Sequence, residues 1–244
     1  MPTIEIDPRF RGFSEIALGG YVGGVLAQGR FDSEVVLRRP VKLSRPYEMK
    51  ANSDGTTSLQ EGNDVLAFDR DSSIDLVPPE PVGLEDSKVA AKDYVGFRKH
   101  LVPSCFNCGP SRWDGLRIFP GIIPGRDVIA APWTPGETLG DSSGVVGSEF
   151  VWSALDCPTI WALVLQGRPD AKEMAVTAKL GVRLISPVHV GQSYVVMGWK
   201  ISENERNKVS GGAIYSADGR LHAVAKHTLA TTTWGVPMGL NSWR

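Results

Sequence analysis

Val35–Tyr47 reads VVLRRPVKLSRPY, and Val182–Tyr194 reads VRLISPVHVGQSY. Pro40 matches Pro187, and the tyrosines that end the two segments match as well. Both matches have the same offset, 147 residues. An apolar, helix-like stretch precedes each segment, and a polar turn with a further strand-like run follows each. A unit of one helix and several strands that is used twice predicts an internal duplication.

The expected elements indicate an α+β fold rather than alternating βα units. Helices are expected near Gly20–Gln28 and Glu149–Gln166, and Pro158 should start or kink the second helix near Asp156. A proline-rich, acidic linker is expected at 78–89. Strand-like runs occupy residues 34–43, 65–68, 73–77, 126–133, 174–188, 194–201, 211–216 and 221–233.

The composition is that of an ordinary globular chain. Of 244 residues, 42% are hydrophobic and 22% are charged, and the net charge is −1. No overall field would therefore recruit nucleic acid or an anionic membrane. No apolar run reaches the roughly 20 residues of a membrane-spanning helix, and the N-terminus MPTIEIDPRF lacks the pattern of a signal peptide. Three cysteines favour reduced thiols, and we expect a cytoplasmic protein.

Asp156, in WSALDCP, is the clearest candidate for chemistry. It is an acid in an otherwise apolar helix, next to a proline that lacks an amide proton. Desolvation by apolar neighbours would raise the pKa of this carboxyl and suit it to general-base work. The alternative is an N-cap aspartate that satisfies free backbone N–H groups and has no catalytic task.

His227 lies on the last strand, where alternation places it on one face with Leu221, Ala223 and Ala225. Small side chains on that face leave room for a ligand beneath the helix. The alternative is a hydrogen-bonded core histidine. His222 and His189 alternate with apolar residues near turns, and we interpret both as surface residues.

Cys105 and Cys108 form a single C-x-x-C, with His100 upstream and Cys157 far along the chain. Structural zinc normally takes four ligands, commonly from two spaced pairs. A second pair is absent and the βαβ context of a thioredoxin-like motif is missing. We therefore expect a structured loop with buried thiols, with no metal, no cofactor and no disulfide at Cys157.

The segment GGYVGG at Gly19–Gly24 is glycine-rich but is not a phosphate loop, because it lacks the Gly-Lys-Ser/Thr sequence. Its glycines would let a backbone approach closely, either from the partner repeat or from a ligand.

Together these features resemble the double hotdog fold of the bacterial type II acyl-CoA thioesterases. The stretch Ala154-Leu155-Asp156 resembles the family helix that carries a catalytic aspartate. Thr177, in VTAKLGVRLISP, falls where the family has a catalytic threonine, and His227 occupies the place of a catalytic glutamine. GGYVGGVLA resembles the glycine-rich helix start of the first unit.

The resemblance implies two tandem hotdog units, each a long central helix wrapped by an antiparallel sheet, that form a pseudo-dimer within one chain. The expected units are 1–92, which is degenerate and includes the linker, and 93–244, which carries the candidate site. We expect one site per chain, since Gly20 and Tyr21 are taken to stand where Asp156 stands in the second unit. The insert CFNCGPSRWDGLRIFPG departs from the type II pattern. By alternation, Thr177 shares a face with Lys179 and Arg183 unless a β-bulge intervenes.

The resemblance implies hydrolysis of an acyl-CoA or acyl-carrier thioester. Asp156 would activate water, Thr177 and His227 would position that water, and substrate would bind at Gly19, Gly20, Tyr21 and Gly23. One alternative is a non-catalytic acyl-CoA or lipid-binding protein. Another is an acyl-CoA hydratase or dehydratase, for which the only Asp-x-x-x-His, Asp218 to His222, fits poorly at a hairpin turn. The sequence does not distinguish acyl chain lengths or CoA from a carrier protein. It is compatible with a homo-oligomer as well as with a monomer.

Overall fold

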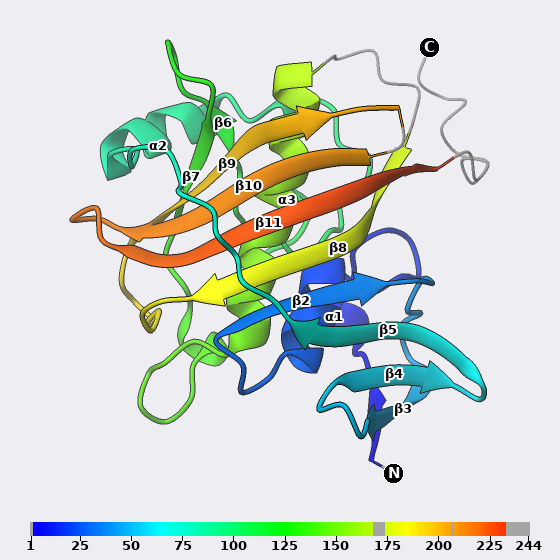
Figure 1. Cartoon of the computed structure of the whole chain (residues 1–244). Coiled ribbons are helices and arrows are strands. Elements are labelled where there is room, and N and C mark those ends of the chain that lie inside the picture. Colours follow the sequence, from blue (N-terminus) through cyan, green and yellow to red (C-terminus); the bar gives the residue numbers. More distant parts are fainter. Residues whose placement is uncertain (1, 168–173, 206, 233–244) are drawn as a thin grey trace.

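The computed structural model describes residues 2–167, 174–205 and 207–232. Within these residues the strands form one antiparallel sheet in the order β1-β3-β4-β5-β2-β8-β11-β10-β9-β7-β6 (Figure 1). The strands are β1 (Thr3–Glu5), β2 (Asp32–Leu37), β3 (Pro46–Ala51), β4 (Thr57–Glu61), β5 (Asp64–Asp71), β6 (Gly121–Ile122), β7 (Ile129–Trp133), β8 (Met174–Leu184), β9 (Tyr194–Glu203), β10 (Asn207–Ser216) and β11 (Leu221–Thr232).

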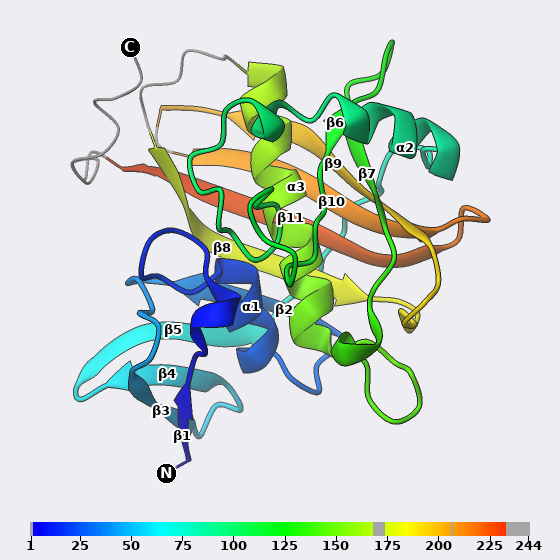
Figure 2. The same cartoon turned by 180° about the vertical axis from the view of Figure 1, so that it is seen from behind.

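The helices are α1 (Gly19–Leu26), α2 (Leu84–Lys92) and α3 (Ser148–Gly167), with short 3-10 turns at Pro8–Phe10, Val95–Phe97 and Glu137–Leu139. Helices α1 and α3 lie on the same face of the sheet (Figure 2). The chain between α2 and β7 passes over α3 on the side away from the sheet (Figure 2). Trp152 lies against Gly23 of α1 and Leu155 against Gly212 of β10, while the covering chain contacts α3 at Ser153 and Cys157, so α3 is buried from several sides.

The two halves join edge to edge through β2 and β8. At the centre of that contact Glu34 pairs with Gly181, and these two residues are themselves 147 positions apart. On either side, Ser33 pairs with Val182 and Val35 pairs with Leu180. Leu180 and Val182 are the counterparts of Ser33 and Val35 at the same offset, so exchanging the two halves leaves the pairing unchanged. The junction is therefore an internal two-fold relationship, and the prediction of two units whose sheets meet edge to edge is confirmed.

The duplication extends to single hydrogen bonds. Tyr47 Oη accepts the backbone N–H of Lys42, and Tyr194 Oη accepts that of His189, both at 2.8 Å. In the segments before the central helices, Leu18 N–H donates to Phe10 O at 2.8 Å. Its counterpart Gly147 N–H donates to Leu139 O at 3.0 Å. These two pairs are 129 residues apart rather than 147, because the second helix and its connection are longer.

Several expectations about single elements are wrong. The first central helix has eight residues and is short rather than long. β2 ends at Leu37, so Pro40 lies after the strand, and residues 73–77 form no strand. The expected linker contains the start of α2, whose acidic first turn and terminal Lys92 complement the helix dipole. Helix α3 is continuous through Pro158.

The division of the chain at 92/93 stays a prediction. The matched elements of the first half end with β5, and those of the second half begin in β7. None of the helices among the described residues is long and apolar enough to cross a membrane.

Candidate active site

Asp156 is held in the middle of α3, where α1 of the other unit crosses it. The side chain is buried, with 1% of its surface exposed. Its Oδ2 accepts the backbone N–H of Gly20 at 2.6 Å. Its Oδ1 is buried and has no hydrogen-bond partner among the described residues. Desolvation by burial raises the pKa of this carboxyl to about 7, with the Gly20 hydrogen bond acting against the rise.

This contact requires glycine at position 20. A Cβ built on Gly20 would lie 2.7 Å from the carbonyl oxygen of Trp152 and 2.9 Å from Cβ of Asp156. Both distances are shorter than van der Waals contact. The absence of a side chain therefore lets the Gly20 amide reach the carboxylate.

His227, on β11, links two hydroxyl groups beside Asp156. Its Nδ1 lies 2.6 Å from Oγ1 of Thr159, and its Nε2 lies 3.0 Å from Oγ1 of Thr177. Thr159 already donates its hydroxyl proton to the carbonyl oxygen of Asp156. Nδ1 must therefore carry the imidazole proton and donate to Thr159, and Nε2 must accept from the Thr177 hydroxyl.

The imidazole is neutral in this arrangement. His227 is fully buried, and desolvation lowers its pKa to about 3. Its Nδ1 lies 4.0 Å from Oδ1 of Asp156, too long for a direct hydrogen bond. His227 is thus both a core histidine with satisfied nitrogens and a neighbour of the open carboxylate oxygen.

Thr177 reaches this group through a β-bulge. The pairing of β8 with β11 shifts between Thr228 and Leu229, so that Lys179 faces Thr228 while Thr177 faces Leu229. Ala178 is the extra residue, and it moves Thr177 to the face of β8 that carries the buried Leu180. The bulge required by the strand-parity argument is present.

The structure thus brings together Asp156, Thr177 and His227, which lie on three separate elements. It adds Thr159, which the sequence analysis missed. The available signal was a hydroxyl three residues after the aspartate, one helical turn along α3.

The predicted substrate-binding residues lie at the start of α1. Gly20 and Gly23 are buried against α3, while Gly19 and Tyr21 are partly exposed. A Cβ on Gly19 would lie 3.2 Å from Oγ1 of Thr177, so this edge of α1 adjoins the site. Their role in binding substrate stays a prediction.

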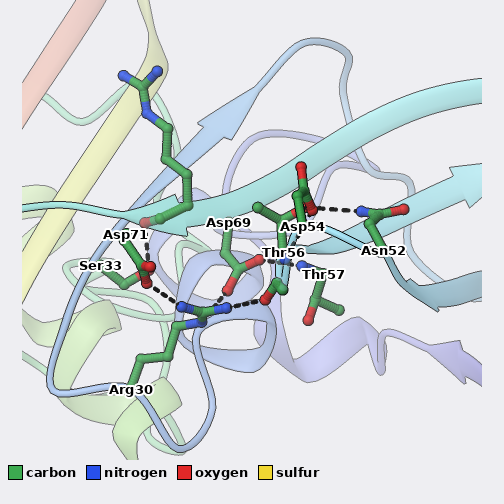
Figure 3. Close-up of polar contacts among 10 residues, drawn as sticks. Arg30, Ser33, Asn52, Asp54, Thr56, Thr57, Asp69 and Asp71 are labelled. Atoms are coloured by element: carbon green, nitrogen blue, oxygen red, sulfur yellow. Dashed lines mark hydrogen bonds and ion pairs between the residues drawn. The ribbon is translucent and has the colours of Figure 1, made fainter.

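The corresponding place in the first unit has different residues. The 129-residue offset of the helices puts Ala27 opposite Asp156, so the expected match of Gly20 and Tyr21 with Asp156 is wrong. In the β2–β5 pairing Asp71 faces Ser33, just as His227 faces Leu180 in β8–β11. Figure 3 shows Arg30 directed at Asp69 and Asp71, with which it forms ion pairs. The first unit therefore has no helix carboxylate at this place.

The remaining histidines and the hairpin aspartate do not form a second pair. His222 is buried rather than on the surface, and its Nδ1 lies 2.7 Å from Pro187 O. His189 is half-buried. Asp218 binds the Ser216 hydroxyl within the exposed β10–β11 turn. Nothing in this geometry favours an Asp218–His222 dyad.

The three cysteines are buried, free and close together, which the sequence did not indicate. Their Sγ atoms all lie within 4.8 Å of one another, and Cys105 Sγ is 3.6 Å from Cys157 Sγ. Nε2 of His100 lies 3.3 Å from Cys108 Sγ. Hydrogen bonds from the Cys108 and Cys157 thiols hold the pKa of the Cys105 thiol well below its usual value. The C-x-x-C motif alone supplies two thiols, and the fold brings Cys157 and His100 next to them.

Comparisons with solved structures match the architecture over nearly the whole chain. The tesB protein of Mycobacterium avium subs paratuberculosis has a TM-score of 0.62 at 12% identity, covering 94% of this chain and 92% of that one. A candidate thioesterase II from Thermobifida fusca has a TM-score of 0.60 at 15% identity, covering 94% and 91%. A conserved protein of unknown function with a hot dog fold from Alicyclobacillus acidocaldarius has a TM-score of 0.58 at 10% identity, covering 95% and 92%.

The chain has the double hotdog fold. The expected architecture of two hotdog units in one polypeptide is therefore confirmed. No protein-family model matches the sequence, and the search of curated proteins gives no match. At these identities the double hotdog likeness establishes the fold and leaves the activity to the chemistry of the site.

Proposed function

We propose that this double hotdog protein hydrolyses a thioester of the acyl-CoA or acyl-carrier type, with a water molecule activated by Asp156. The observation that carries the proposal is the asymmetry of the Asp156 carboxylate. Oδ2 is fixed by Gly20, while Oδ1 is buried with no partner among the described residues. A buried acceptor without a partner needs a functional or solvent explanation, and a water held for attack provides one.

Thr177 would give that water its second contact. Its hydroxyl proton is committed to Nε2 of His227, so the lone pairs of Oγ1 are available to accept. A water that donates one proton to Asp156 and the other to Thr177 is oriented with its own lone pair toward the substrate. His227 acts here as a positioning residue for Thr177, since it is buried and neutral.

The start of α1 would stabilise the oxyanion. The first N–H groups of a helix have no partner within the helix. Gly20 uses its N–H for Asp156, which leaves the amides of Gly19 and Tyr21 for a ligand. Gly19 and Thr177 are both partly exposed and adjacent, so we place the entry of the thioester carbonyl there. Donors aimed at a developing oxyanion are typically a large contribution to acyl-transfer catalysis.

The proposed steps balance without a cofactor. The water oxygen forms a bond to the carbonyl carbon while its proton passes to Asp156. The tetrahedral intermediate then collapses, the C–S bond breaks, and the thiolate leaving group takes up the proton. The products are a carboxylic acid and a free thiol. Two proteins of similar structure carry the names tesB protein and candidate thioesterase II, which supports this reaction class.

The alternative from the sequence is a binding protein without catalysis. In that case the same site would bind a thioester and would not hydrolyse it. Its support is the histidine at 227, whose two nitrogens are already satisfied by hydroxyl groups. A panel of acyl-CoA esters of increasing chain length separates the two functions. If the chain is a thioesterase, it should release many molecules of free thiol per protein molecule, and one carboxylic acid should form for each thiol. Saturable acyl-CoA binding without thiol release would establish the binding function instead.

A further inference from the structure

We infer that the chain binds one zinc ion between Cys105, Cys108, Cys157 and His100. The inference does not rest on the proposed hydrolysis, because it is tested by metal content, although the cluster adjoins the turn of α3 that carries Asp156. It replaces the expectation that no metal is present.

The spacing of the three sulfur atoms, together with the contact of His100 to Cys108, approaches that of tetrahedral coordination. Zinc–sulfur bonds of about 2.3 Å and a zinc–nitrogen bond of about 2.0 Å imply S···S edges of about 3.8 Å and S···N edges of about 3.5 Å. In the structure Cys105 Sγ and Cys157 Sγ are 3.6 Å apart, and Cys108 Sγ and His100 Nε2 are 3.3 Å apart. All three sulfur atoms lie within 4.8 Å of one another. His100 Nε2 does not lie within 4.8 Å of all three sulfur atoms, so the His100 ring must move toward the cysteines to complete the tetrahedron.

The surrounding backbone is organised to hold these ligands. Cys105–Cys108 is a tight loop in which Gly109 N–H donates to Cys105 O at 3.0 Å. The Asn107 side chain donates to the carbonyl oxygen of Ser153 and so fixes the loop on α3. Tyr94 Oη donates to Cys108 O at 3.1 Å from the other side. Two ligands thus come from one loop and a third from α3, and each is positioned independently of a metal.

His100 must change its protonation to serve as the fourth ligand. Val102 N–H donates to Nδ1 at 2.9 Å, so the metal-free imidazole carries its proton on Nε2, facing Cys108. Zinc binding through Nε2 displaces that proton, and Nδ1 then becomes protonated and loses the bond from Val102. We therefore expect the 100–102 segment to be the part of the cluster that rearranges on loading.

Four protein ligands leave no open position, so the ion would be structural. It would tie the loop that crosses α3 to the helix turn that carries Asp156. Ligand deprotonation makes the affinity dependent on pH, and chelation would loosen this cross-link. Zinc suits the cluster better than hard cations, because three of the four donors are thiolates.

The test is the metal content of untagged protein purified from zinc-supplemented cells under reducing conditions, without chelators. We expect one zinc per chain by elemental analysis, and an X-ray absorption spectrum with three sulfur ligands and one nitrogen. Cys157→Ser and His100→Asn should each weaken zinc binding by more than about tenfold, since even outer-shell changes at zinc sites cost about 10–100-fold. The matched control His189→Asn, at a half-buried histidine outside the cluster, should keep one zinc.

Less than a tenth of an equivalent of zinc in wild-type protein, with no uptake on titration of the reduced chain, would overturn the inference. So would a Cys105–Cys157 disulfide in protein kept reduced throughout purification, or a spectrum without sulfur ligands. The wild-type spectrum decides the matter even if a cysteine variant fails to fold.

Discussion

The carboxylate of Asp156 on α3 accepts the backbone N–H of Gly20 on α1 at 2.6 Å, across a separation of 136 residues. The two residues come from different hotdog units. The candidate site therefore exists only when the duplicated halves are packed together, and the short first helix supplies a functional contact even though its unit has no carboxylate of its own.

Gly20→Ala tests this contact. A methyl group would meet the Trp152 carbonyl and the Asp156 side chain at less than 3 Å, so we expect a loss of about 1–3 kcal/mol in the free energy of unfolding, the usual cost of overpacking. Urea denaturation measures the loss. The control is Gly136→Ala, where an added Cβ meets no atom within 4 Å and φ is −74°. Equal stability of the two variants would show that the helices can move apart without cost.

Thr177 should matter through its hydroxyl group. Thr177→Val keeps the shape but leaves Nε2 of His227 without its donor, so we expect about 1–3 kcal/mol of destabilisation together with a fall in hydrolysis rate. Thr177→Ser retains the hydroxyl and should recover most of both. Thr228→Val, on the neighbouring face of the same bulge, is the control and should change neither. An active Thr177→Val protein would remove Thr177 from the mechanism.

His227→Gln separates positioning from proton transfer. A glutamine side chain can accept from Thr177 and donate toward Thr159, as the neutral imidazole does. We therefore expect kcat to stay within about tenfold of wild type, below the 10²–10⁴-fold contribution of a proton-transferring group. His222→Gln controls for the loss of a buried histidine elsewhere. A loss of kcat as large as that of an Asp156 variant would show that the imidazole itself moves a proton.

Stability at acidic pH should report the buried imidazole. Its pKa is about 3 in the folded chain and about 6.5 when unfolded, so the unfolded state binds more protons between these values and stability falls with falling pH. Between these two pKa values the free energy of unfolding should fall by up to about 1.4 kcal/mol for each pH unit. Asp156 faces the ring with a raised pKa and titrates in the opposite sense, so Asp156→Asn isolates the histidine.

The measurement compares urea unfolding of Asp156→Asn with Asp156→Asn/His227→Gln at pH 4.5, 5.5 and 7.5. The single variant should lose stability toward pH 4.5 relative to the double variant. Parallel stability curves for the two proteins would contradict a buried neutral imidazole.

The duplicated fold could be predicted from the sequence because Pro40 and Tyr47 recur at a fixed offset beside local turn and strand patterns. The tyrosines make the same hydrogen bond in both units, which explains why they recur. Local signals identified Asp156 and His227 as candidates, whereas Thr177 came only from the resemblance to the type II thioesterases. The parity conflict at Thr177 indicated a bulge that the structure contains.

What could not be predicted depends on contacts between distant segments. His222 is buried where its imidazole meets the Pro187 carbonyl, and the thiol cluster needs α3 to bring Cys157 to Cys105, 52 residues earlier in the chain. The counterpart of Asp156 in the first unit was misassigned because the helices and the strands follow different offsets. The hydrophobic periodicity of a single segment does not show which distant segments will contact it, so it could not predict these three features.

The most direct test of the account is single-turnover thioester hydrolysis by wild type and Asp156→Asn, each checked for the same fold by circular dichroism and the same acyl-CoA affinity. Asparagine preserves the size of the side chain and an oxygen for the Gly20 N–H, but it cannot take the proton of water. We expect unchanged acyl-CoA binding and a hydrolysis rate that falls by a factor on the order of 10² or more in Asp156→Asn. A wild-type rate in the Asp156→Asn protein would show that the aspartate only joins the two helices, and that the proposed mechanism is wrong.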